Sequence, residues 1–150
     1  MPLNIDIHEE RSLVKIIKDP KKVEEVRLPN GLTMELWDYS RRLAGDRWLV
    51  GLLVKIPMEV AESDFESIED GSGLFQEFLE KNGGRTILFQ VQKERNFIDE
   101  REKDQVFQSI MDNLKQHSMD YMGHKAFAAG YKRRVIKEFL ERRRWWNGNQ

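Results

Sequence analysis

The residues best suited to bind a metal ion are His117, Asp120 and His124, near the end of a predicted helix. Their spacing of i, i+3 and i+7 places the three side chains within about 60° of one another on a continuous helix. Imidazole and carboxylate groups are ligands that zinc and similar ions accept. However, Gly123 interrupts the helical pattern before His124, and no further histidine or glutamate is placed to complete the shell. We therefore expect no metal and no cofactor.

The C-terminal sequence ERRRWWNGNQ, residues 141–150, joins arginines to two tryptophans, a composition typical of nucleic-acid-binding tails. On a predicted helix over about residues 125–146, four basic side chains lie opposite the apolar stripe: Arg133, Arg134, Lys137 and Arg144. Glutamates four residues away from several of them are typical of a solvated helix face. Trp146 shares the stripe of Phe139 and is expected to be packed.

Two large aromatic residues, Trp37 and Tyr39, lie on one face of a predicted strand, opposite its alternating apolar residues. If the apolar face points toward the helices, the two rings point away from them. The rings then either cover the second face of the sheet or form a partner-binding surface with Arg41 and Arg42. A second copy of the chain could use the same surface, and both interpretations are open.

Sequence motifs of the common enzymes are absent. The chain contains no G-x-S-x-G, no H-E-x-x-H and no G-x-G-x-x-G. It also contains no cysteine, which excludes a disulfide framework, a thiolate metal site and a cysteine nucleophile. An enzyme would have to use an unrecognised histidine and carboxylate site.

The elements that position these residues begin with strands. Strands are predicted over residues 23–28, 32–40, 47–56 and 85–94, with an edge strand at residues 13–17. Asn30-Gly31 favours a hairpin turn between the first two of them, and Pro57 is expected to end the third.

The helical spacing of apolar residues predicts where the helices lie. A short helix around Leu74–Leu79 is predicted to stop at Gly83, and a long helix is predicted to end at Gly123. Asp99, with Glu102 three residues later, is expected to cap the start of that long helix. The sequence therefore predicts a single α+β domain over residues 1–150. It is an antiparallel β-meander of about four or five strands, covered on one face by a short middle helix and two long C-terminal helices.

Charge is segregated along the chain, although the net charge is only −1. Residues 59–80 carry eight acids and no Lys or Arg, whereas residues 124–150 carry eight basic residues and two acids. We expect the two segments to lie near each other, either within the fold or across a dimer.

The start of the chain lacks the pattern of a signal peptide, and its longest apolar run, Trp48–Val54, is too short to span a bilayer. We expect a soluble, cytoplasmic protein that acts as an interaction or regulatory module and does not enter the membrane. It self-associates, first of all as a homodimer, or binds a protein partner. A nucleic-acid-associated protein that uses the basic C-terminal helix is the alternative, and a hydrolytic or metal-dependent enzyme is third.

Overall fold

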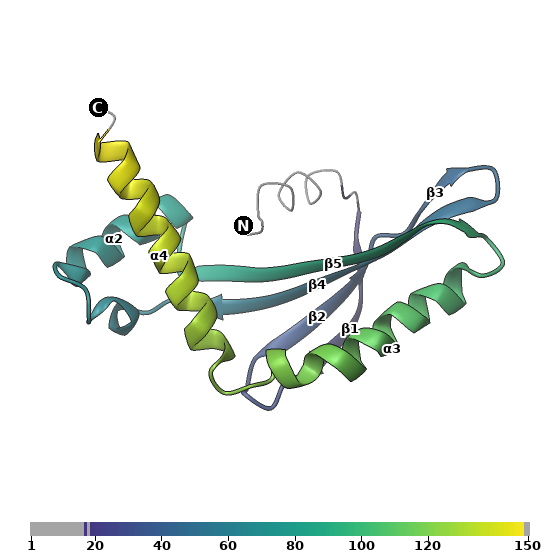
Figure 1. The fold of residues 1–150 in the computed structure, drawn as a ribbon, viewed down its shortest axis with the longest axis horizontal. Helices are drawn as coiled ribbons and strands as arrows, with labels where there is room; N and C mark the ends of the chain where they lie inside the picture. Colours follow the sequence, from purple (N-terminus) through teal and green to yellow (C-terminus); the bar gives the residue numbers. More distant parts are fainter. Residues whose placement is uncertain (1–16, 18, 149–150) are drawn as a thin grey trace. The chain divides into compact units, whose positions relative to one another are not determined.

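The computed structural model describes residue 17 and residues 19–148 of the chain (Figure 1). Antiparallel strands form a five-stranded sheet in the order β1-β2-β4-β3, and β5 also pairs with β4. The strands are β1 (Lys21–Arg27), β2 (Thr33–Asp38), β3 (Arg41–Ala44), β4 (Arg47–Glu59) and β5 (Thr86–Asp99). The helices are the 3-10 helix η1 (Glu62–Phe65), α2 (Gly71–Asn82), α3 (Lys103–Met122) and α4 (Phe127–Gly148). The predicted α+β class is confirmed, whereas the predicted edge strand at residues 13–17 lies largely outside the described residues.

The β1–β2 hairpin forms where Asn30-Gly31 predicts it. Gly31 adopts a φ of 91°, a conformation that glycine adopts without steric cost. The Asn30 side chain accepts a hydrogen bond from the Leu32 N–H at 3.1 Å. Its amide donates to the carbonyls of Met122 and His124, at 2.9 and 3.0 Å. The turn is thereby tied to the end of α3.

Strand β4 continues to Glu59, so the prediction that Pro57 ends it is wrong. The β2–β4 register runs from Asp38–Leu52 to Glu35–Lys55, and Pro57 lies beyond these pairs. A proline removes only the hydrogen bond that its own N–H would donate, so pairing along the rest of a long strand can carry the strand past it.

The start of α3 also differs from the prediction. Asp99 ends strand β5, which is longer than predicted, and α3 begins at Lys103. The Asp99 carboxylate accepts the N–H of Arg101 at 2.9 Å, and its carbonyl accepts the N–H of Glu102 at 2.8 Å. Asp99 therefore closes a turn between strand and helix and does not cap the helix.

Contacts within the chain form two compact units. Unit 1 contains the described residues up to Val26, together with Glu35–Lys55 and Gln90–His117. Unit 2 contains Arg27–Met34, Ile56–Phe89 and the described residues from Ser118 onward. The single-domain organisation over residues 1–150 stays a prediction.

In unit 1, α3 covers one face of the strands (Figure 1). Ile110, Met111 and Leu114 of α3 are buried, and Lys115 pairs with Glu24 of β1 at 2.8 Å. The helix therefore joins the sheet by an apolar face with one ion pair beside it.

The other face of unit 1 carries a small cluster around Tyr39, Leu49 and Leu53. The Tyr39 ring lies directly over Gly51 of β4, where a Cβ atom would overlap the ring. Gly51 is thus required by the close approach of an aromatic ring to the backbone.

Unit 2 is held together by aromatic side chains. Phe65 is fully buried, and its ring centroid lies 5.6 Å from that of Phe75 and 5.8 Å from that of Phe78. Phe78 of α2 meets Phe139 of α4 edge-to-face at 5.4 Å. Such tilted and edge-on pairs are the favoured arrangements of aromatic rings. They fix η1, α2 and α4 against one another.

A second aromatic group in unit 2 joins α4 to β5. The ring of Phe89 meets those of Phe127 and Tyr131 edge-to-face, at 5.0 and 5.2 Å. The Tyr131 hydroxyl donates to the Leu88 carbonyl at 3.2 Å. Both the start and the middle of α4 therefore have partners within unit 2.

Candidate interaction groove

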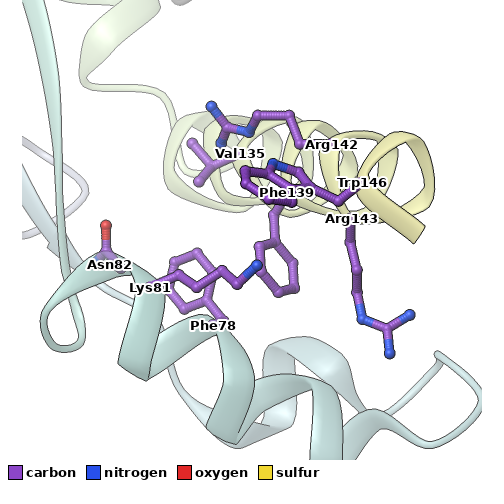
Figure 2. Close-up of a pocket in the computed structure, with 8 residues that line it drawn as sticks. All are labelled: Phe78, Lys81, Asn82, Val135, Phe139, Arg142, Arg143 and Trp146. Carbon is purple, nitrogen blue, oxygen red and sulfur yellow. The ribbon is translucent and has the colours of Figure 1, made fainter. Parts of the chain in front are cut away.

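A groove of about 450 Å³ opens in unit 2 between α2 and α4 (Figure 2). It is lined by Phe78, Lys81, Asn82, Val135, Phe139, Arg142, Arg143 and Trp146. We call it the basic groove, because three of its lining residues are cationic. It lies at the C-terminal end of α2 and along the second half of α4.

The floor of the basic groove is apolar and buried. Phe78 and Phe139 are 3% and 5% exposed, and Val135 is half-buried beside them. The edge-to-face contact of the two rings sets the separation of the helices at this point. A ligand side chain in the groove would therefore meet a preformed apolar surface.

The rim carries Trp146 and the cations. Trp146 is 57% exposed, so the prediction that it is packed is wrong. Helical periodicity places Trp146 on the stripe of Phe139, as predicted, but the last turns of α4 leave most of the indole uncovered. The Lys81 ammonium lies 5.6 Å from the centroid of the Trp146 ring.

The two arginines of the rim differ in their partners. Arg143 donates to the Glu77 carboxylate at 2.8 Å, whereas Arg142 is exposed and has no ion pair among the described residues. Positive charge at Lys81 and Arg142 is thus open to a ligand.

An acidic turn, Glu66–Asp70, lies at the other end of α2. Glu66, Glu69 and Asp70 are exposed, and Ile68 between them is half-buried. The Ile68 N–H donates to the Phe65 carbonyl at 3.0 Å, so the turn is anchored on the aromatic core. The turn therefore presents one apolar side chain among carboxylates.

The predicted proximity of the acidic and basic segments is confirmed within unit 2. Lys132 pairs with Asp64 at 3.5 Å, and Arg143 pairs with Glu77 at 2.8 Å. These two ion pairs neutralise only part of the positive charge of α4. Three further basic residues of α4 are exposed and have no ion pair among the described residues: Arg133, Lys137 and Arg144.

Arg134, the fourth cation proposed for nucleic-acid binding, pairs with Glu138 one turn later at 3.2 Å. It therefore differs from the three unpaired cations of the same helix.

The three candidate metal ligands are not brought together. His117 and Asp120 lie on α3, but His124 lies beyond its end, where its Nδ1 accepts the Ala126 N–H at 3.1 Å. Within residues 17 and 19–148, no group of three His, Cys, Asp or Glu side chains could hold a metal ion.

Trp37 and Tyr39 lie on the face of unit 1 opposite α3. Tyr39 is 7% exposed, and its hydroxyl donates to Glu94 at 2.8 Å. Burial, followed by this hydrogen bond, raises the pKa of Tyr39 well above its usual value. Trp37 is half-buried, with the Lys55 ammonium 4.4 Å from its ring centroid. This packing accounts for both rings without a partner.

Arg41 and Arg42 are exposed on β3. Arg42 donates to Glu100 at 2.9 Å and lies 5.8 Å from the centroid of the Trp48 ring. A partner-binding role for Trp37, Tyr39 and the two arginines stays a prediction.

Sequence reasoning missed Phe78, Lys81 and Arg142 as site residues. The signal that pointed toward them was the charge segregation, since it predicted that the acidic and basic segments lie close together. The position of the groove depended on which helix α4 packs against, and that pairing is not encoded in local patterns.

None of the helices within the described residues is long and apolar enough to cross a membrane. Comparisons of the chain with protein-family models, with curated proteins and with solved structures gave no match.

Proposed function

We propose that the protein is a self-associating interaction module that forms a two-fold dimer through unit 2. In this dimer the acidic turn of each copy occupies the basic groove of the other. The observation that supports the proposal is the placement of two complementary surfaces at opposite ends of the same helix, α2. The chain has no cysteine, which suits a reducing compartment, and we place the dimer in the cytoplasm.

The length of α2 allows both contacts of a two-fold dimer to form at once. Its twelve residues span about 18 Å at the usual helical rise. A two-fold axis through the middle of α2 sets the helices of the two copies antiparallel. Each acidic turn then lies against the partner's basic groove, and the same contact is made twice.

The exposed side of α2 is compatible with close approach of a second helix. Ser72, Gly73 and Gln76 are exposed there, and none of them is large and charged. Small residues let helix backbones approach closely. The centre of the proposed interface is therefore small and uncharged, and Glu80, one turn after Gln76, lies toward its ends.

The chemistry of the two surfaces matches. Ile68 would meet the apolar floor formed by Phe139 and Val135, while carboxylates of the turn would meet Lys81 and Arg142. Apolar contact would supply most of the affinity, and the charges would fix the register. Because the charges lie at the rim, the dimer should weaken as salt rises.

Sedimentation velocity over a range of protein concentrations tests this proposal. We expect the wild-type protein to sediment as a dimer at low salt, and Lys81→Glu/Arg142→Glu to sediment as a monomer. The matched control, Lys93→Glu/Arg95→Glu, reverses two exposed cations of unit 1 and should remain dimeric. A monomeric wild type at all concentrations, or a control that dissociates as readily as the groove variant, would reject the proposed interface.

A further inference from the structure

We infer that the solvent-facing side of α4 carries a second site, which binds a single-stranded polynucleotide through its phosphates. The site consists of Arg133, Lys137 and Arg144, which we call the basic row, with Trp145 beside it. This inference goes beyond the proposed dimer, because it uses a different face of α4.

The three cations of the basic row share one face of the helix. At 100° per residue they fall within about 40° of one another, and Arg142 of the groove lies about 160° away from them. At 1.5 Å per residue their positions are about 6 and 10 Å apart along the axis. One polynucleotide strand that follows the helix would pass all three cations in turn.

The charges of the row are available to a ligand. Arg133, Lys137 and Arg144 are exposed, and no carboxylate within the described part of the chain pairs with them. Glu141 is exposed four residues after Lys137, but it forms no ion pair with it. Contacts of these cations with phosphates would release the counterions condensed on the polynucleotide, which favours binding at low salt.

Trp145 favours a single strand as the occupant. Its side chain is 65% exposed, and it follows Arg144 in the sequence, about 100° around the helix from the centre of the row. In single-stranded complexes, an aromatic ring beside phosphate-binding cations stacks on an unpaired base. The bases of a duplex are stacked on one another and do not offer that face.

Fluorescence anisotropy with labelled oligo(U) and oligo(dT) tests the inference. Each phosphate contact to a single strand contributes about 0.7 to the slope of log K against log salt, so three contacts predict a slope near −2. Arg133→Gln/Lys137→Gln/Arg144→Gln should abolish binding and its salt dependence. Trp145→Ala should weaken binding but leave the slope unchanged, because it removes no phosphate contact.

The matched control removes the same charge elsewhere: Arg27→Gln/Lys93→Gln/Arg95→Gln, all exposed, should bind like wild type. Absence of binding at low salt would overturn the inference, and so would equal losses in the control and row variants. Anionic lipid vesicles that bind the row more tightly than either oligonucleotide would assign it to a membrane surface instead. The row variant keeps every groove residue, so sedimentation shows separately whether the dimer survives.

Discussion

The floor and the rim of the basic groove should differ sharply in their contribution to stability. Phe139 and Trp146 lie on one stripe of α4, but they are 5% and 57% exposed. We predict that Phe139→Ala destabilises the protein about twice as much as Trp146→Ala, although tryptophan is the larger residue.

The cost of Phe139→Ala follows from its burial. An aromatic side chain of this size buries about 190 Å² when almost fully covered, which is worth about 5 kcal/mol at 25 cal/mol/Å². A compact unfolded state lowers this value to about 3 to 4 kcal/mol. Loss of the edge-to-face contact with Phe78 adds about 0.5 to 1.5 kcal/mol. The expected total is about 4 kcal/mol, within the range for buried aromatic residues.

For Trp146 the same reasoning gives a smaller cost. Less than half of its surface is covered, or about 100 Å², which is worth at most about 2.5 kcal/mol. The compact unfolded state reduces this to about 2 kcal/mol. The side chain lies at an open rim, so its removal leaves no closed cavity and adds no cavity penalty.

Urea unfolding followed by circular dichroism measures both changes, at a protein concentration low enough to keep the dimer from adding its own stability. Phe139→Leu serves as the control, since it keeps most of the apolar volume and should lose much less than Phe139→Ala. Equal losses for Phe139→Ala and Trp146→Ala would refute the description of floor and rim.

Three further predictions concern unit 1. Gly51→Ala should lower the melting temperature markedly, because the new methyl group overlaps the Tyr39 ring; Tyr39→Ala in the same chain should restore part of the loss. Because the pKa of Tyr39 is raised in the folded state, only the unfolded state loses this proton above about pH 10, and the stability of the protein should fall there. Tyr39→Phe should remove that fall, as measured by thermal melts at several pH values. The side-chain hydrogen bond from Arg101 lowers the pKa of Asp99 in the folded state. The ionised Asp99 carboxylate therefore stabilises the protein above about pH 4, and this contribution is lost as the pH falls through the folded-state pKa. Asp99→Asn should flatten this loss of stability at acid pH in the same melts.

Features set by local chemistry could be predicted from the sequence. Asn30-Gly31 specifies a turn with positive φ, and Gly83 ends α2 at a φ of 79°, because both conformations favour residues of these types. The amphipathic pattern likewise predicted α3 and its end at Gly123. These signals act within a few residues and need no knowledge of the rest of the fold.

Features set by distant partners could not be predicted. Pro57 lies within β4 because β4 pairs with β2, β3 and β5 over a long stretch, and these distant partners carry the strand past the one N–H that a proline lacks. Periodicity gave the direction of Trp146 but not the extent of its cover, which depends on where α2 ends beside α4. The groove has the same origin, since Lys81 and Arg142 are far apart in sequence and meet only through the contact of Phe78 with Phe139.

The most direct test of the proposed dimer is an exchange of charge between its two surfaces. Lys81→Glu/Arg142→Glu makes the groove acidic, and Glu66→Arg/Glu69→Arg makes the turn basic, so each variant alone should repel itself. Four attractive rim pairs become repulsive in each case. At about 0.5 kcal/mol lost and a similar repulsion gained per pair, the dimer should weaken by about 4 kcal/mol, or roughly a thousandfold.

In an equal mixture of the two variants, every acidic surface can again meet a basic one in both halves of the dimer. Sedimentation velocity of this mixture should therefore show a heterodimer of about wild-type affinity, while each variant alone sediments as a monomer. A mixture that remains monomeric, or single variants that dimerise as well as wild type, would contradict the proposed pairing of acidic turn and basic groove.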